Sequence, residues 1–457
     1  METKVACGEG EVQLSIPDST AVQILAPNSP KLDFDVLGSF RKALENPIGK
    51  TLGELAKGKK IVLLVQDQTR SIKEKKELGE AILGELGRVK PSSLSVLIAT
   101  GTHKPNDQKN REIIQMLESL ALKYGLSASF QEHDSEQGKR PEEYENNVFV
   151  GTTPAGTPVY SNRKHMEADV IVGIESMKMH YFAGYSNMLK LLALPGPSGY
   201  ETVRINHLLI LDPLSSVCSH PFHYKNTDNP IANDMREAYK LIILHQLIDG
   251  KMVKLNSPRP VFVLASVTEA RGERLGVVWC RAGEAEAVTR EGIIVIDQNY
   301  TFKADPADIL IVGAGPAPQD RHLFYVHNGV DTAKRGLKRG GSILVIAECP
   351  EGIGPEGKQT DKFISAMKRP KDQILSYVRE NFQIGMQKSY KLAELLGQSN
   401  EICVYVSPKS KLDEGELKEM HLSSTRDPQK WLDQKLAENQ LASVLIITRG
   451  ATRTAII

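Results

Sequence analysis

The sequence lacks the features that mark secreted, membrane-spanning or nucleic-acid-binding proteins. Its five cysteines are an odd number scattered over 457 residues, which argues against a disulfide framework and a Cys-x-x-Cys zinc site. No apolar run approaches the roughly 20 residues that cross a bilayer. The first residues carry acidic side chains and no apolar core, unlike a secretion signal. The 57 basic and 56 acidic residues leave no basic excess for nucleic acid. We therefore expect a cytoplasmic protein without membrane or nucleic-acid partners.

What is present is typical of a large α/β protein. The length predicts two sizeable domains, and 40% hydrophobic with 25% charged residues indicates a globular chain. Short β-branched runs alternate with longer amphipathic segments, the pattern of parallel strands covered by helices. We expect strands at residues 60–67, 94–100, 169–175, 261–267, 308–314, 341–348, 401–407 and 442–449. We expect helices at residues 75–89, 109–125, 233–249 and 330–339.

The pattern changes around residues 280–305, where a charged helical stretch gives way to a new strand–turn–helix unit. We therefore predict an N-terminal α/β domain over residues 1–290 and a C-terminal α/β domain over residues 291–435. Residues 436–457 contain a last strand, and we leave open its return to the N-terminal domain.

Polar side chains follow three of the predicted strands, where ligands collect in parallel sheets. Asp67 and Arg70 follow the first strand, His103 the second and His180 the third. An arginine fork can bind a carboxylate or phosphate, or Arg70 can pair with Asp67. Histidines can donate and accept protons near neutral pH, or can lie in the core bonded to carbonyls. Each residue alone fits an ordinary polar loop, but the three loops together favour a functional site.

The densest polar motif runs over residues 180–207. Lys190 precedes the apolar run LLAL, so burial would make its amine a nucleophile or attachment point; an exposed lysine is the alternative. His207 could bind a metal, but a lone histidine does not supply the three or four donors that a metal centre needs. The protein residues alone therefore do not predict a complete metal site.

Taken together, these motifs resemble the nickel-dependent lactate racemase family. The resemblance extends over most of the chain and includes segments near Asn229-Pro230 and residues 352–354. The motifs that carry it are Asp67 to Arg70, Ala99 to His103, His180 to Ser186, Lys190, Pro195-Gly196 and Asn206-His207.

The resemblance implies two α/β domains with the active site in the cleft between them. It also implies a nickel-pincer nucleotide, of the pyridinium-3,5-bisthiocarboxylic acid mononucleotide type, that brings two sulfurs and a carbon to nickel. Proteins that synthesise this cofactor would be partners. By resemblance, Lys190 is the cofactor tether, His207 the nickel ligand, His103 and His180 the acid/base pair, Arg70 the carboxylate binder, and Asp67 a cofactor or site-orienting contact.

The implied activity is a racemase or epimerase that inverts the hydroxyl-bearing carbon of a 2-hydroxy acid. A hydride leaves this carbon for the cofactor while a histidine takes the hydroxyl proton, and the hydride returns to the opposite face. Phe324, Tyr325 and Asn328 stand where lactate-specific members carry Tyr, Gln and Lys that reach the substrate. We therefore expect a substrate other than lactate, a larger 2-hydroxy acid or a sugar acid.

Two further segments bear on alternative functions. Asn187-Met188-Leu189 precedes Lys190 where the family usually has Gly-Gly, which favours a second hypothesis, a cofactor-free homologue that binds a carboxylate ligand without turnover. Residues 308–318 begin like a dinucleotide-binding fingerprint, but the third glycine is absent and prolines occupy the turn. This segment therefore does not predict NAD binding.

Overall fold

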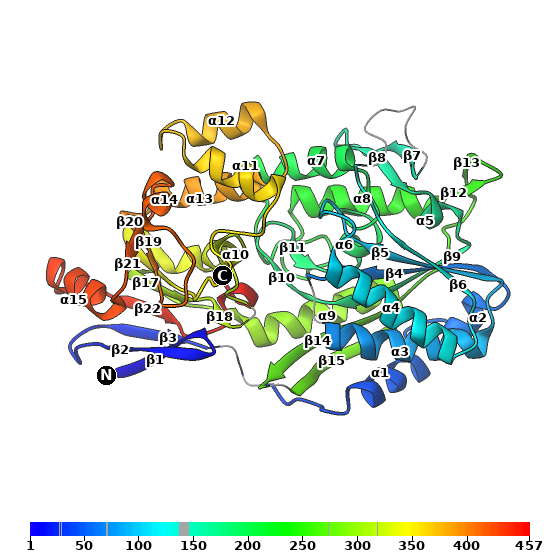
Figure 1. The fold of residues 1–457 in the computed structure, drawn as a ribbon, viewed down its shortest axis with the longest axis horizontal. Coiled ribbons are helices and arrows are strands. Elements are labelled where there is room, and N and C mark those ends of the chain that lie inside the picture. Colours follow the sequence, from blue (N-terminus) through cyan, green and yellow to red (C-terminus); the bar gives the residue numbers. More distant parts are fainter. Residues whose placement is uncertain (27, 29, 70–71, 137–145, 273, 318) are drawn as a thin grey trace.

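Two six-stranded sheets organise the chain (Figure 1). The structure is a computed structural model that describes residues 1–457 apart from residues 27, 29, 70–71, 137–145, 273 and 318. It confirms the predicted α/β class with two domains, each built around one sheet. None of the helices in the described part of the chain is long and apolar enough to cross a membrane.

The first sheet has the order β15-β14-β9-β4-β5-β6, and only the β14–β15 pair is antiparallel. Its central strand β4 is apolar on both faces because helices cover both. Val62 and Leu64 pack into one core cluster, while Ile61, Leu63 and Val65 pack into another. The strands are β4 (Lys60–Gln66), β5 (Ser93–Ala99), β6 (Ala128–Glu132), β9 (Val170–Ser176), β14 (Val261–Arg271) and β15 (Arg274–Glu284).

The helices of the first domain lie on both faces of this sheet, and three small hairpins extend from it (Figure 1). The helices are α1 (Val36–Glu45), α2 (Leu52–Ala56), α3 (Ile72–Val89), α4 (Gln108–Lys123), α5 (Arg163–Glu167), α6 (Met188–Leu192), α7 (Tyr200–Leu208), η2 (Leu209–Leu211), α8 (Pro230–Leu244) and α9 (Ala285–Tyr300). The hairpins are β7 (Asn147–Thr152) with β8 (Pro158–Asn162), β10 (Lys178–His180) with β11 (Gly184–Ser186), and β12 (His245–Ile248) with β13 (Lys251–Lys254).

The second sheet is wholly parallel, in the order β21-β20-β19-β17-β22-β3. Its strands are β3 (Val22–Leu25), β17 (Ala307–Gly313), β19 (Leu337–Ile346), β20 (Glu401–Tyr405), β21 (Ser423–Thr425) and β22 (Val444–Ile447). Its helices are α10 (Leu323–Ala333), η3 (Lys334–Gly336), α11 (Lys358–Met367), α12 (Ile374–Asn381), α13 (Met386–Gln398), α14 (Glu414–Glu419), α15 (Pro428–Glu438) and η4 (Ala451–Arg453). Short strands β1 (Glu2–Gly8), β2 (Gly10–Ser15) and β18 (Gly315–Pro316) form one small sheet, and β16 (Thr301–Phe302) pairs with β23 (Ala455–Ile456).

Both ends of the chain lie in the second domain (Figure 1). Strand β3 pairs with β22, so the first 25 residues do not belong to the domain predicted over residues 1–290. Strand β22 is fully buried between β17 and β3, which corrects the suggestion that the last strand returns to the first domain. The passage from the first sheet to the second runs through α9, within the window of residues 280–305 where the sequence pattern changes.

Two helix predictions extend too far. The chain predicted as a helix over residues 330–339 leaves α10 at Ala333, makes a 3-10 turn and enters β19 at Leu337. The helix predicted over residues 233–249 ends at Leu244, where β12 begins with His245. Past Leu244 the apolar pattern continues with Leu247 and Ile248, and such a short run does not separate a helix from a strand.

Candidate active site

Asp67 and His103 meet at the carboxyl edge of the first sheet. Their strands, β4 and β5, are parallel neighbours, so the loops that follow them leave the sheet on the same side. Asp67 Oδ2 lies 2.5 Å from His103 Nδ1, and Thr69 donates its hydroxyl to the other carboxylate oxygen over 2.5 Å. The buried carboxylate therefore orients the imidazole of His103 through Nδ1. Arg70 lies outside the described residues.

The loop that carries His103 is anchored on the turn that follows Lys190. Gly101 N–H donates to the carbonyl of Gly196 over 3.0 Å, and Gly196 N–H donates to the carbonyl of Lys190 over 2.9 Å. Gly101 has a φ of 58°, and a Cβ there would lie 3.0 Å from Pro195. Only glycine fits this approach without displacement. Two motifs that are distant in sequence, residues 99–103 and 195–196, thus form one structural unit.

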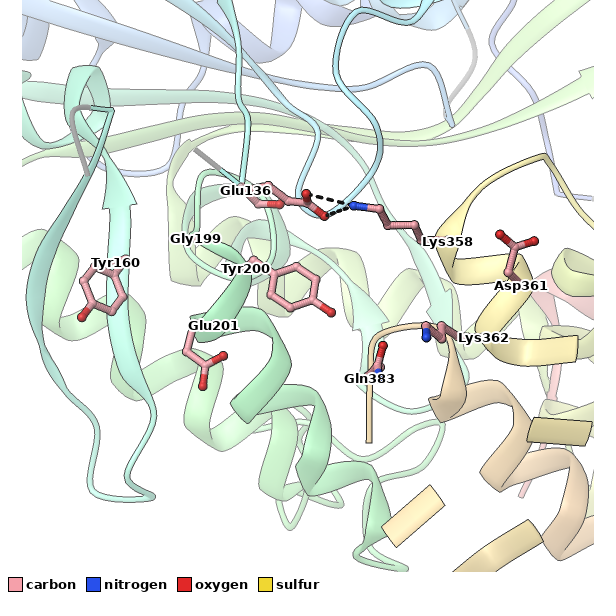
Figure 2. Close-up of a pocket in the computed structure, with 10 residues that line it drawn as sticks. Glu136, Tyr160, Gly199, Tyr200, Glu201, Lys358, Asp361, Lys362 and Gln383 are labelled. Carbon is pink, nitrogen blue, oxygen red and sulfur yellow. Dashed lines mark hydrogen bonds and ion pairs between the residues drawn. The ribbon is translucent and has the colours of Figure 1, made fainter. Parts of the chain in front are cut away.

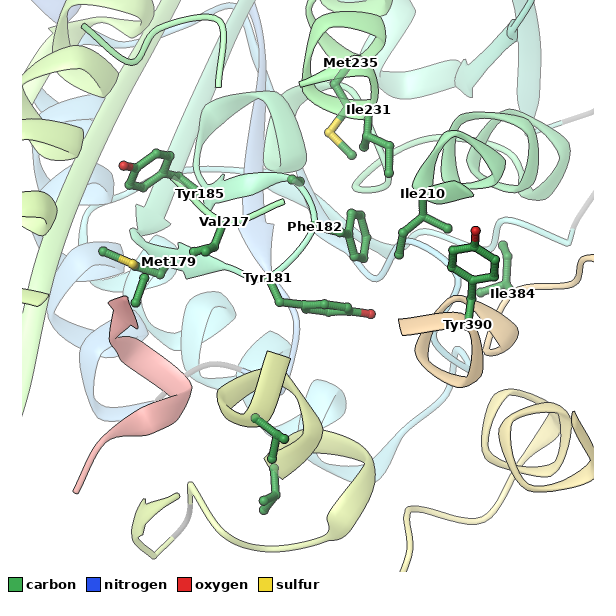
Figure 3. Packing of buried hydrophobic residues seen from close by; sticks show 14 of the residues in the cluster. Met179, Tyr181, Phe182, Tyr185, Ile210, Val217, Ile231, Met235, Ile384 and Tyr390 are labelled. Atoms are coloured by element: carbon green, nitrogen blue, oxygen red, sulfur yellow. The ribbon is translucent and has the colours of Figure 1, made fainter. Parts of the chain in front are cut away.

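Phe182 connects three of the predicted site residues. It lies in the turn between β10 and β11, and its ring centroid is 4.4 Å from that of His180 and 5.0 Å from that of His207. Lys190 Nζ lies 5.6 Å from the same centroid. Phe182 and the neighbouring Tyr181 are both buried and lie side by side, 4.8 Å between centroids (Figure 3). Phe182 lies within the sequence motif of residues 180–186, in which only His180 has a predicted role.

His207 has the properties of a metal ligand that is held neutral. It lies on α7 and is buried, and its Nδ1 contacts Asn206 Oδ1 at 3.2 Å. Asn206 is itself bonded to Asp234 at 2.8 Å, which fixes the tautomer with the proton on Nδ1. Burial, followed by the nearby charge of Lys190, lowers the pKa of His207 to about 3. Among the described residues Nε2 has no hydrogen bond, so its lone pair remains available.

The described residues contain no group of three His, Cys, Asp or Glu side chains that could hold a metal ion. A single buried imidazole beside a lysine fits a cofactor that carries most of its own metal ligands and is attached through an amine. The residues present at Lys190 and His207 therefore fit a lysine-tethered metal cofactor better than a metal bound by protein side chains alone.

The residues before Lys190 form a buried helix start. Asn187 caps α6 by accepting the Leu189 N–H over 2.9 Å, and its amide lies 2.7 Å from His220 Nε2. Met188 and Leu189 are buried, while Lys190 is partly exposed. The side chains of Asn187, Met188 and Leu189 are thus accommodated in the core, while Lys190 keeps partial exposure.

The second domain contributes α10 and α13 to the opposite side. Tyr325 Oη accepts a hydrogen bond from Lys178 Nζ of β10 over 2.7 Å. Asn328 Oδ1 accepts one from Lys388 Nζ of α13 over 2.5 Å. Lys388 Nζ also lies 4.5 Å from the ring centroid of Phe324. All three predicted second-domain residues therefore contact a lysine, either Lys178 or Lys388. Neither lysine was predicted as a site residue.

A cavity of about 710 Å³ lies where the two domains meet (Figure 2). Lys358 of α11 forms an ion pair with Glu136 of the first domain at 3.2 Å across it. Next to Lys358, Gln359 donates to the carbonyl of Thr102 over 2.8 Å and so touches the loop that carries His103. Of the predicted site residues that the structure describes, none lines this cavity. It is lined by Ser135, Glu136, Tyr160, Gly199, Tyr200, Glu201, Lys358, Asp361, Lys362 and Gln383.

Comparison with known families covers both domains. Residues 7–217 match the lactate racemase N-terminal domain, and residues 302–453 match the lactate racemase C-terminal domain. The chain belongs to the lactate racemase family. This agrees with the resemblance carried by the sequence motifs.

Two curated relatives and two solved structures place this family member more closely. It is 28% identical to the lactate racemase of Thermoanaerobacterium thermosaccharolyticum over 407 residues, 86% of this chain and 85% of that protein. It is 28% identical to the lactate racemase of Lactiplantibacillus plantarum over 327 residues, 70% of this chain and 68% of that protein. The lactate racemase apoprotein structure from T. thermosaccharolyticum superposes with a TM-score of 0.80 at 25% identity, over 100% of this chain and 99% of that one. A Thermotoga maritima protein shares the fold, with a TM-score of 0.61 at 17% identity over 94% and 100% of the two chains.

Proposed function

We propose that this family member is a racemase or epimerase that inverts the hydroxyl-bearing carbon of a 2-hydroxy acid by reversible hydride transfer. The observation that carries the proposal is the arrangement around Phe182, where one ring contacts an acid/base candidate, a candidate tether and a candidate metal ligand. These three roles are the ones that a cofactor-dependent inversion requires at one reaction centre.

The proposed cofactor is a nickel-pincer nucleotide, held by Lys190 through its amine and by His207 through Nε2 at nickel. When bound, it supplies a hydride acceptor beside the substrate carbon. The neutral state of His207 supports the ligand role because a metal requires the unprotonated nitrogen. Asn206 holds the ring in the required tautomer.

His103 and His180 are proposed to exchange the hydroxyl proton of the substrate. His103 is oriented by Asp67 through Nδ1, and its Nε2 is proposed to accept this proton. His180 accepts the Ala183 N–H at Nδ1 over 3.3 Å, and its Nε2 is proposed to carry the proton. Two histidines suit an inversion because the two stereoisomers present their hydroxyl groups on different sides of the pocket. The domain contact through Gln359 and Thr102 can shield the planar keto acid from water.

Arg70 is proposed to bind the substrate carboxylate, and Phe324, Tyr325 and Asn328 of α10 are proposed to form a wall of the substrate pocket. This wall offers aromatic surface and bound lysines. This surface supports the proposal that the substrate is a 2-hydroxy acid larger than lactate, or a sugar acid. We further propose that the protein acts in the cytoplasm and receives its cofactor from synthesis proteins.

The decisive experiment is peptide mass spectrometry on protein produced together with the pincer-nucleotide synthesis proteins. We expect a sulfur-containing, nucleotide-sized adduct on the Lys190 peptide, absent in Lys190→Ala and retained in Lys164→Ala, a control on α5. Lys164 is paired with Glu167 away from this site. An unmodified Lys190, in cells where a known family enzyme is modified, would contradict the proposal and favour a cofactor-free homologue that binds a carboxylate ligand.

A further inference from the structure

Lys388 is a buried amine that has no counter-ion within the described part of the chain. Its residue is 6% exposed, on the buried face of α13. Among the described residues it forms no ion pair, and its hydrogen bond goes to the neutral amide of Asn328. An ammonium has three donors, so two remain for another partner. The rings of Tyr181 and Phe324 lie 4.8 and 4.5 Å from Nζ and favour a cation between them.

Two further polar atoms beside this amine lack partners within the described residues. Tyr181 Oη and His327 Nδ1 are buried and make no hydrogen bond, although both residues are only 3% exposed. The two rings meet edge to face, 5.6 Å between centroids. Buried polar groups are nearly always hydrogen-bonded in folded proteins. A cluster of a cation and two unsatisfied polar groups at one place therefore indicates a ligand with acceptor atoms.

The charges around Lys388 favour an anion. Asp331 faces it from α10 but is already paired with Lys334 at 2.9 Å. Lys178 faces it from β10 and adds a second positive charge. Lys391, the next buried lysine on α13, is paired with Glu394 at 3.3 Å. His322 and His327, the titratable groups of α10 that feel its charge, are both held neutral by burial, which lowers the pKa of each.

The cluster lies beside the proposed acid/base residue. Tyr181 follows His180 directly, and the two rings are stacked with 5.2 Å between centroids. A group bound between Tyr181 and Lys388 would therefore belong to the same molecule whose hydroxyl reaches His180. Arg70, in the proposed function, takes the carboxylate next to the reacting carbon. A second acidic group needs the separate cation that the second domain provides.

We propose that Lys388 and Tyr181 bind a second carboxylate of the substrate, which makes the substrate class a 2-hydroxy dicarboxylic acid. The inference rests on the proposed function for the identity of the reacting carbon. Lys388, on α13, determines the specificity for a dicarboxylic substrate, and Asn328 orients its amine.

This assignment has a signature in proton uptake. Burial lowers the pKa of Lys388 to about 7, with Asp331 acting to raise it and Lys178 to lower it. At pH 8 the free amine is therefore mostly neutral, and an arriving carboxylate favours the charged form. Binding should take up about one proton at Lys388.

The test is calorimetry at pH 8 on cofactor-loaded protein, in buffers that differ in ionisation enthalpy. Racemic malate is the dicarboxylate probe, because turnover of a racemate causes no net conversion, and racemic lactate is the monocarboxylate probe. The wild type should bind malate at least about 10-fold more tightly than lactate. Lys388→Met should weaken malate binding about 100-fold and reduce the uptake by about one proton. Lys388→Arg should retain malate binding without that proton, because arginine stays charged.

The matched control is Lys391→Met, one turn along the same helix and equally buried. It should bind malate with wild-type affinity and proton uptake. Equal affinities and proton uptake in the wild type and Lys388→Met overturn the inference, as does a wild type that fails to bind malate. The proposed function is judged separately, by the adduct on Lys190: malate binding with proton uptake but no adduct rejects that function and retains the subsite. An adduct on Lys190 together with racemisation of lactate but not malate retains the proposed function and rejects the subsite.

Discussion

Asp67 Oδ2 and His103 Nδ1 lie 2.5 Å apart although 36 residues separate them in sequence. The contact exists because parallel strands β4 and β5 are adjacent and end at the same edge of the sheet. Asp67 is buried and His103 is half exposed, so one partner is fixed and the other faces the site. The pair has the geometry of a carboxylate that orients a proton-transferring imidazole.

Asp67→Asn should lower kcat by about 100-fold, because the amide does not hold the His103 ring with a negative charge. Steady-state racemisation assays by chiral chromatography measure this effect, with the melting temperature as a check on folding. Asp107→Asn is the control on the neighbouring loop, which carries His103, since asparagine also caps α4 there. A wild-type kcat in Asp67→Asn would show that His103 does not depend on this carboxylate.

Replacing either His103 or His180 by Gln should lower turnover by about two to four orders of magnitude, the usual contribution of a general acid or base. The two variants should keep the Lys190 adduct, which separates proton transfer from cofactor loading. His421→Gln is a control in the second domain, where this ring is bonded to the carbonyl of Arg369. Near-normal turnover in both single variants would reject the acid/base assignment.

His207→Ala should release nickel while the nucleotide stays on Lys190. The imidazole is the one protein nitrogen proposed at the metal, so its removal should affect metal content before covalent attachment. Metal analysis by mass spectrometry and peptide mass spectrometry on the same sample measure both. Wild-type nickel content together with an intact adduct would point to a different ligand.

The first domain should lose stability in acid. His133 is fully buried, and burial lowers its pKa from 6.5 to about 4. Below about pH 6.5 the unfolded chain is protonated at His133, whereas in the folded domain this residue stays neutral down to about pH 4. The free energy of unfolding therefore decreases as the pH falls through this range. At about 1.4 kcal/mol per pKa unit, His133 alone should cost about 3 kcal/mol by pH 4.

Tryptophan fluorescence can follow this loss in one domain. The chain has two tryptophans, Trp279 in the first sheet and Trp431 in the second domain, so Trp431→Phe isolates the first. Urea unfolding at pH 7, 6 and 5 should show that the free energy of unfolding decreases steeply as the pH is lowered. His133→Gln should reduce the slope by the contribution of one proton, and an unchanged slope would contradict the assignment.

The sequence was sufficient for elements whose signals are local. All eight predicted strands are present because each is a short apolar run that helices cover on both sides. It failed for β3, whose four residues are mostly half-buried and show no period. The partner of β3 is β22, at the other end of the chain, and a pairing over that distance leaves no trace in local periodicity.

The candidate site divides in the same way. The contact between Asp67 and His103 could be predicted because neighbouring parallel strands end at one edge of the sheet, whereas the catalytic roles of His103 and His180 stay predictions. Lys388 could not be predicted, since its position depends on how α13 packs against Tyr181 of the other domain. The one available signal was a lysine four residues before Leu392 on the buried helix stripe, where a charge is unexpected.

Strand β3 and strand β22 are neighbours, which makes the first domain an insertion within the second. During synthesis the first sheet can assemble as soon as β15 is made, whereas the second sheet must wait for the last residues of the chain. The insertion also ties the domains together at two points, after β3 and through α9. A double connection of this kind restricts how the two domains can move relative to each other.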